Sequence, residues 1–185
     1  MGRDKALVRL GGKALIDHVR AAAKSLRAPV RIIQRDCRPG RGPVGGIHTG
    51  LTENPRELLY FLSCDMPFVS GELLRNLRQK LGSESLAIFV QRGAQVGFPC
   101  LLRRQALAVV EAQLADPQAS LQKLAAALGA QTLRPPRARQ WELFNINTPD
   151  ELIAAGQFWR RRQEGQTSGG LKKARTVSAA GPAPE

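Results

Sequence analysis

Apolar residues recur along this chain in two patterns, one typical of helices and one typical of strands. Where they return at spacings of three and four residues they predict amphipathic helices, over residues 14–26, 70–81, 105–114 and 120–128. Short blocks rich in β-branched and aromatic residues predict strands, over residues 30–34, 57–62, 86–90, 98–102 and 141–144. Because strands alternate with helices, we expect an α/β domain whose mainly parallel sheet is covered on both faces.

The apolar patterning stops near Gln163, which divides the chain into two parts. Residues 1–162 have the apolar content of one globular domain, in a chain of 185 residues that is 43% hydrophobic. Residues 163–185 are rich in Gly, Ser, Thr, Pro and Ala, so we expect a disordered tail there. No apolar run approaches the roughly 20 residues of a membrane span, and no signal segment opens the chain, so we expect a cytoplasmic protein without membrane contact.

The formal charge of +13 indicates an anionic ligand. Nucleic acid and small phosphate-bearing molecules both meet that requirement. Aromatic residues make up only 5% of the chain, which leaves few stacking platforms and disfavours single-stranded nucleic acid. The three cysteines form no Cys-x-x-Cys pair and only two histidines are present, which argues against a zinc site.

A lone carboxylate, Asp65, follows the apolar block at 57–62. In open α/β sheets ligands bind beyond the carboxyl ends of the strands, where an acid can hold a metal ion for a phosphorylated ligand. The alternative is that Asp65 merely caps the turn before Pro67.

Residues 36–46 carry four glycines and two prolines, which predicts a loop, and a helix is expected from Ile47 onward. Exposed backbone N–H groups at such a helix start can bind anions, and the glycines allow a ligand to approach the backbone closely. An ordinary solvent-exposed loop is the alternative.

Asn145 and Asn147 alternate along an extended segment and can present two amides to one side. Thr148, Pro149 and Glu151 then form a capping box that starts a last helix. The two amides serve either a ligand or the helix start.

Four motifs occur together in this order along the chain, at residues 2–6 (Gly-Arg-Asp-Lys-Ala), 42–47 (Gly-Pro-Val-Gly-Gly-Ile), 64–68 (Cys-Asp-Met-Pro-Phe) and 145–149 (Asn-Ile-Asn-Thr-Pro). The combination resembles the molybdenum cofactor guanylyltransferases, also called molybdopterin-guanine dinucleotide synthases. The resemblance runs from Met1 to about Trp159. It implies a three-layer, Rossmann-like nucleotidyltransferase fold.

The activity that the resemblance implies is Mg²⁺-dependent transfer of GMP from GTP to the molybdenum-molybdopterin cofactor, with release of pyrophosphate. Asp65 and Lys5 are then the catalytic residues, with Asp65 on the metal and Lys5 on the phosphates. Asn145 and Asn147 fall in the region that faces the pterin substrate. Molybdenum-inserting proteins and molybdoenzyme chaperones are the implied protein partners. The implied nucleotide-binding residues are Gly2, Lys5, Asp36, Gly42, Pro43, Gly45 and Asp65.

Two departures from the family pattern concern the start of the domain. Family members open with a strand and a Leu-Ala-Gly-Gly-x-Ser-x-Arg-Met-Gly loop, of which only Met1 and Gly2 match, so we expect an N-terminally truncated domain whose first strand is missing. Only nine residues separate Leu26 from Asp36, so one βα unit is also expected to be absent. Two alternatives stay open: the related cytidylyltransferase, which uses CTP, and a degenerate, non-catalytic basic protein that binds nucleotide.

Overall fold

A mixed β-sheet forms the middle layer of the domain in the computed structural model, which describes the backbone of residues 5–176 and the side chains of residues 6–164. Its strands, in spatial order, are β3 (Leu58–Phe61), β5 (Gln95–Arg103), β4 (Ala87–Arg92) and β6 (Gln131–Leu133). Strand β5 is antiparallel to both of its neighbours, and β4 is parallel to β6. The sequence predicts a mainly parallel sheet, and three of its four strands, β3, β4 and β6, do run in one direction. Because β5 runs the other way between β3 and β4, two of the three strand pairings are antiparallel.

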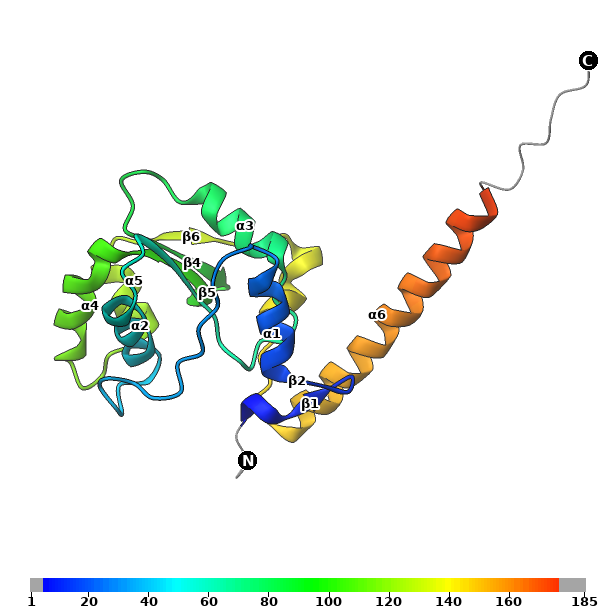
Figure 1. The fold of residues 1–185 in the computed structure, drawn as a ribbon, viewed down its shortest axis with the longest axis horizontal. Helices are drawn as coiled ribbons and strands as arrows, with labels where there is room; N and C mark the ends of the chain where they lie inside the picture. Colours follow the sequence, from blue (N-terminus) through cyan, green and yellow to red (C-terminus); the bar gives the residue numbers. More distant parts are fainter. Residues whose placement is uncertain (1–4, 177–185) are drawn as a thin grey trace, which may run out of the picture.

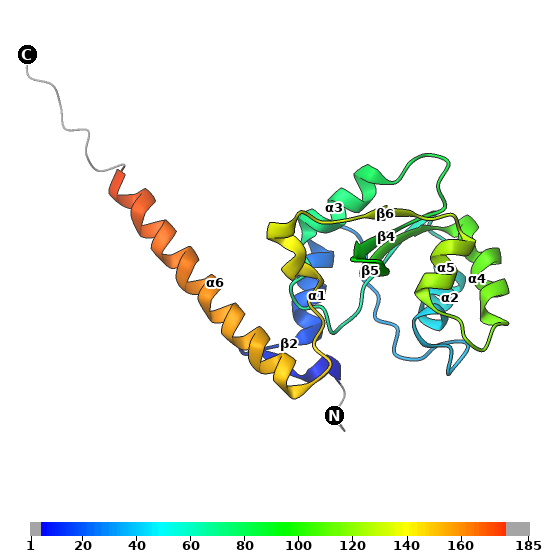
Figure 2. The ribbon, with the colours of Figure 1, turned by 180° about the vertical axis from the view of Figure 1, so that it is seen from behind.

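Helices cover both faces of this sheet, as Figures 1 and 2 show from opposite sides. One face carries α2 (Gly42–Glu53), α4 (Leu107–Leu114), which follows the short helix η2 (Arg104–Ala106), and α5 (Leu121–Ala127). The other face carries α1 (Leu15–Lys24) and α3 (Gly71–Lys80). The predicted three-layer arrangement is confirmed.

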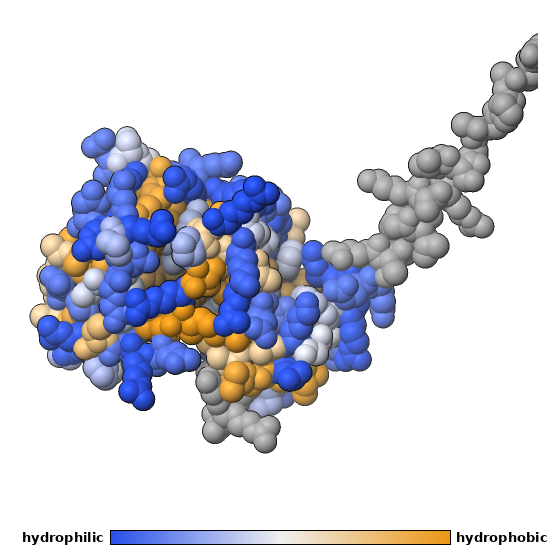
Figure 3. Space-filling view, in the orientation of Figure 1, coloured by the Kyte–Doolittle hydropathy of each residue, from blue (hydrophilic) through white to orange (hydrophobic). Residues whose placement is uncertain are grey.

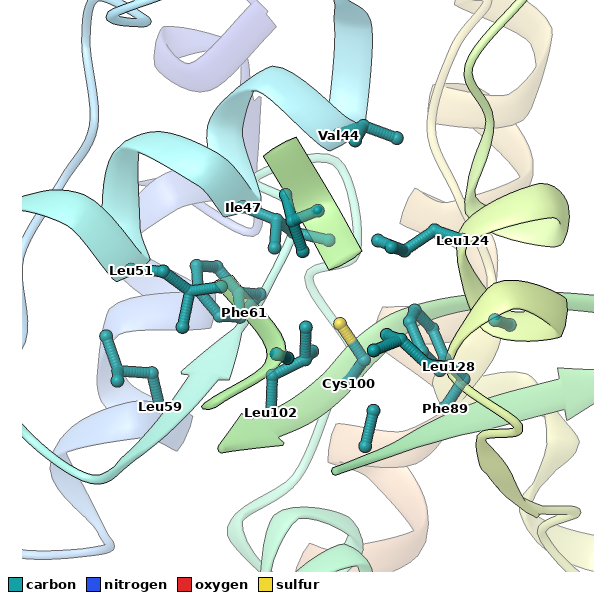
Figure 4. Packing of buried hydrophobic residues seen from close by; sticks show 14 of the residues in the cluster. Val44, Ile47, Leu51, Leu59, Phe61, Phe89, Cys100, Leu102, Leu124 and Leu128 are labelled. Carbon is teal, nitrogen blue, oxygen red and sulfur yellow. The ribbon is translucent and has the colours of Figure 1, made fainter. Parts of the chain in front are cut away.

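Neighbouring residues of β4 and β5 point to opposite faces of the sheet and build two separate cores. Phe89 lies opposite Cys100 in the ladder, and both are fully buried beneath α2 and α5. Figure 4 shows this cluster from close by, with Ile47 of α2 directed into it. Burial raises the pKa of the Cys100 thiol well above its ordinary value, so the thiol behaves as an apolar core group. Ile88 and Leu101 instead pack toward α1 and α3.

A third cluster joins the N-terminal segment to the first part of the last helix. The helix η1 (Lys5–Leu7) and a hairpin of β1 (Arg9–Leu10) and β2 (Lys13–Ala14) lie beside the start of α6 (Pro149–Thr176). Phe68 is at the centre of this cluster, with ring centroids of Phe158 and Trp159 at 5.2 and 6.3 Å. The later part of α6 runs away from the body (Figure 1).

Helix α6 continues to Thr176, beyond Gln163, where the sequence predicts that disorder begins. Residues 177–185 lie outside the described part of the chain. The division into a domain of residues 1–162 and a tail of 163–185 therefore stays a prediction. Among the helices of residues 5–176, none combines the length and the apolar character that a membrane span requires.

Three sequence predictions of local structure are wrong. Residues 30–34 form no strand, and Val30 and Ile32 stay 41% and 37% exposed. A strand needs a hydrogen-bonded neighbour, and within residues 5–176 no strand pairs with the outer edge of β3. The surface therefore keeps exposed apolar residues, and Figure 3 shows such residues gathered in the middle of one face.

The second error concerns residues 141–144, which end the helix η3 (Arg137–Leu143) instead of forming a strand. Trp141 packs edge-on against Phe68, so its ring is partly buried without a sheet. The third error is the start of α2, which begins at Gly42, five residues before the predicted Ile47. Proline is favoured in a first helical turn, and Pro43 occupies that place.

Candidate functional site

Asp65 lies beyond the carboxyl end of β3, in the short connection to α3. Its Oδ1 atom is buried and has no hydrogen-bond partner among the described residues. A buried carboxylate oxygen without a partner costs free energy, and such an atom in a native fold commonly marks a bound ion or a ligand. Asp65 is therefore a candidate ligand for a cation, and this role stays a prediction.

The segment of Asn145 and Asn147 is attached directly to Asp65. The backbone N–H of Ile146 donates a hydrogen bond to the carbonyl oxygen of Asp65, with 2.9 Å between N and O. Ile146 is buried, whereas Asn145 and Asn147 on either side of it are exposed. The structure thus joins the backbone of the segment that carries both asparagines to the backbone of Asp65, after β3. The role of these amides on a pterin stays a prediction.

The predicted capping box follows directly and is confirmed. The Oε2 atom of Glu151 accepts hydrogen bonds from the N–H groups of Asn147 and Thr148, at 2.6 and 2.9 Å. The hydroxyl oxygen of Thr148 accepts in return from the N–H of Glu151 at 3.2 Å. This local network fixes the direction in which α6 leaves the Asn145–Asn147 segment.

Asp36 lies against the first turns of α2. A Cβ atom added to Gly45 would be 3.2 Å from Oδ2 of Asp36 and 3.1 Å from the carbonyl oxygen of Arg38. The hydroxyl of Thr49 donates to the carbonyl oxygen of Gly45 and accepts from the N–H of Cys37, both at 2.9 Å. Gly42, Pro43 and Gly45 are therefore residues of a helix start, with Asp36 packed beside them.

The close approach at Gly45 gives a stability prediction. We expect Gly45→Ala to be less stable than the wild type by about 1–2 kcal/mol, because the backbone of Arg38 must shift to admit the methyl group. Gly46→Ala is the matched control, since its Cβ would lie 3.7 Å from Asp36, an ordinary contact, and alanine favours the helix by about 0.5–1 kcal/mol. Urea denaturation measures both; equal stabilities for the two variants would contradict this packing.

The structure describes little of Gly2 and Lys5, the two predicted site residues at the start of the chain. Gly2 lies outside the described residues, and of Lys5 the structure describes the backbone, as the first residue of η1, but not the side chain. Their predicted roles in nucleotide binding and catalysis therefore stay predictions.

A cavity of about 440 Å³ opens beside the connection that carries Asp65. The guanidinium of Arg162 stacks over the ring of Trp141, with 3.9 Å from the guanidinium carbon to the ring centroid. Aromatic faces and cationic groups can hold a flat anionic ligand. The sequence does not single out Trp141 and Arg162, because they lie on different elements and belong to none of the four motifs. The aromatic and basic lining residues are Lys13, His18, Phe68, Trp141, Trp159 and Arg162.

A second cavity, of about 420 Å³, lies between residues 37–41 and helices α2 and α4. Arg38, Arg41 and His48 line it. The buried His48 ring is 3.6 Å from a carboxylate oxygen of Glu111. Neither this cavity nor the one beside residues 67–71 is lined by any predicted site residue whose side chain the structure describes.

The donor set fits a magnesium ion that is held jointly with a ligand. Within the described residues, no three His, Cys, Asp or Glu side chains gather into a metal site. Mg²⁺ needs no such cage, because it commonly takes one or two carboxylates and completes its shell with phosphates and water. Asp65 supplies one carboxylate whose Oδ1 has no partner among the described residues, so the side chains present are compatible with a magnesium ion.

Comparison with known proteins shows the family of this chain. A family model described as a MobA-like NTP transferase domain matches residues 1–133. The molybdenum cofactor guanylyltransferase of Pseudomonas fluorescens is 30% identical over 169 residues, which cover 82% of this chain and 84% of the relative. A probable molybdenum cofactor guanylyltransferase of Flavobacterium johnsoniae is 26% identical over 166 residues, covering 82% of this chain and 87% of the relative.

Solved structures show the same architecture. Molybdopterin-guanine dinucleotide biosynthesis protein A from Archaeoglobus fulgidus superposes with a TM-score of 0.70 at 22% identity, over 86% of this chain and 92% of that one. A 4-diphosphocytidyl-2C-methyl-D-erythritol synthase from Anaerococcus prevotii gives 0.66 at 12% identity, over 84% and 93%. The predicted nucleotidyltransferase fold is confirmed. The chain belongs to the family of MobA-like NTP transferase domains.

Proposed function

We propose that this protein transfers GMP from GTP to the molybdenum-molybdopterin cofactor and releases pyrophosphate. The observation that carries the proposal is Asp65, which follows β3. Its Oδ1 has no partner among the residues that the structure describes, and its backbone binds the Asn145–Asn147 segment. The names of the relatives as molybdenum cofactor guanylyltransferases support the choice of both substrates.

The reaction needs positioning and charge neutralisation more than proton transfer. A terminal phosphate oxygen of the pterin cofactor, already ionised at neutral pH, forms a bond to the α-phosphorus of GTP. The bond from that phosphorus to the oxygen bridging the α- and β-phosphates breaks, and both electrons leave with pyrophosphate. No strong general base is required, and the barrier falls mainly through alignment and electrostatic stabilisation.

The residues divide this work between them. Asp65 would hold Mg²⁺, which when bound supplies positive charge against the phosphates. Lys5 would add a second positive charge. Asp36 and the start of α2 (Gly42, Pro43, Gly45) would orient the nucleotide, with Gly2 ahead of them in the chain.

Both proposed substrates are anions that the rest of the site and the charge of the protein have to accommodate. The amides of Asn145 and Asn147 would contact the pterin, beside Asp65. The net charge of +13 would raise the local concentration of GTP and of the phosphorylated cofactor. We place the reaction in the cytoplasm and expect molybdenum-inserting proteins and molybdoenzyme chaperones to receive the product.

A side-by-side assay tests the proposal. The purified chain is incubated with the molybdenum-molybdopterin cofactor, Mg²⁺ and either GTP or CTP, and pyrophosphate release is measured. We expect kcat/KM to be at least about 10-fold higher with GTP, a difference of about 1.4 kcal/mol in transition-state free energy. Preference for CTP would identify the cytidylyltransferase alternative, and binding of GTP without pyrophosphate release would identify a non-catalytic nucleotide-binding protein.

A further inference from the structure

Glu142 is a charged residue that the proposed chemistry does not use, yet it is fully buried. Its carboxylate lies near the end of η3, three residues before Asn145. Oε1 accepts a hydrogen bond from Nε of Arg139 at 2.5 Å, and Oε2 accepts one from the hydroxyl of Ser70 at 2.6 Å. Burying a carboxylate is costly unless it is paired and hydrogen-bonded, as it is here.

Ser70 connects this carboxylate to the segment that carries Asp65. Its hydroxyl donates to Glu142 and accepts from the N–H of Leu73 at 3.1 Å and from Nη2 of Arg139 at 3.0 Å. The bond from Leu73 makes Ser70 the N-cap of α3, as the sequence predicts. The far end of the connection that begins at Asp65 is therefore tied to Glu142.

Two bonds thus join the same two segments at both ends. Ile146 binds the backbone of Asp65, and Glu142 binds the side chain of Ser70. The pairing of 146 with 65 and of 142 with 70 means that the segments run in opposite directions. We propose that Glu142 is a positioning residue, which holds the Asn145–Asn147 segment in register with Asp65.

Arg139 completes the network, and its second partner, Glu72, provides a control. Burial opposes its charge, but the hydrogen bonds and negative charges of Glu142 and Glu72 outweigh that effect and raise its pKa above the ordinary value. Glu72 pairs with the same guanidinium from α3, yet its side chain is 58% exposed, and the bond between Glu142 and Ser70 does not involve it. Removal of the Glu72 charge therefore perturbs the network without releasing the segment.

The first test measures amide hydrogen exchange and does not depend on the proposed function. In Glu142→Gln we expect the N–H of Ile146 to exchange at least about 10-fold faster, while the N–H of Arg103, bonded to the Leu86 carbonyl in the sheet, changes by less than twofold. Glu72→Gln should leave both rates within twofold. Equal acceleration at Ile146 and Arg103 would mean general destabilisation, and no acceleration at Ile146 would remove the positioning role.

The second test is kinetic and rests on the proposed function. We expect Glu142→Gln to raise the KM for the pterin cofactor about 10-fold, with the KM for GTP within twofold of wild type and Glu72→Gln unchanged. If the wild type transfers no GMP, the proposed function fails, and the exchange experiment still decides the role of Glu142. If Glu142→Gln does not fold, Ser70→Ala removes the bond to Glu142 together with the α3 cap, keeps the pair of Glu142 with Arg139, and is measured by the same exchange rates, with Arg103 again reporting general destabilisation. An unchanged KM for the pterin in a variant with faster Ile146 exchange would overturn the functional part of the inference.

Discussion

Asp65→Asn is expected to lower the rate of GMP transfer by about 10²–10³-fold, the usual loss when a group that stabilises transition-state charge is removed. A neutral amide cannot hold Mg²⁺ as a carboxylate does. The fold should persist, because Oδ1 has no hydrogen-bond partner among the described residues and the bond to Ile146 uses the backbone of Asp65. Steady-state pyrophosphate release measures the effect.

A metal-binding measurement distinguishes loss of Mg²⁺ binding in Asp65→Asn from misfolding of the variant. Mn²⁺ binding, followed by water proton relaxation in the presence of GTP, should weaken at least about 10-fold in Asp65→Asn, while the melting temperature stays within a few degrees of wild type. Glu84→Gln is the control, since Glu84 is an exposed carboxylate between α3 and β4 and lines neither cavity described above. Unchanged binding of Mg-GTP in Asp65→Asn would favour the non-catalytic basic protein over the enzyme.

Phe89→Ala is expected to cost about 3–5 kcal/mol of unfolding free energy, the largest stability effect that we predict. Phe89 is fully buried in the centre of β4, and Figure 4 shows it in the cluster that α2 and α5 close. Removal of the ring loses its transfer free energy and leaves a cavity that the surrounding sheet cannot fill. For a domain of this size the change corresponds to a fall of about 10–15 °C in melting temperature.

Urea denaturation and thermal melting both measure this effect. Ile153→Ala is the control because Ile153 is 60% exposed on α6, and its truncation should change stability by less than about 0.5 kcal/mol. A loss below about 1.5 kcal/mol for Phe89→Ala would show that the core does not pack around β4 as described. Since a domain of this kind has about 5–15 kcal/mol of stability in total, the expected loss is a large share of it.

Helices and caps were predictable because the interactions that specify them lie within a few residues. The apolar spacing after Ser70 places α3, and the Ser70 hydroxyl bonds the N–H of Leu73, three residues later. The same holds for the bonds of Glu151 with Thr148 at the start of α6. Local pattern failed at residues 30–34, where β-branched composition favours a strand but a strand forms only against a neighbour.

The sequence by itself determined the candidate acid, the two amides and the family. Asp65 after an apolar block, Asn145 and Asn147 in alternation and the helices around them are all readable in short windows. Only the tertiary structure decided that α2 begins at Gly42, that Asp65 meets Ile146, and that the buried Glu142 binds Ser70 across 72 residues of chain. The reason is physical: spacing and capping act between near neighbours, whereas burial and long-range hydrogen bonds depend on which segments the complete fold brings together.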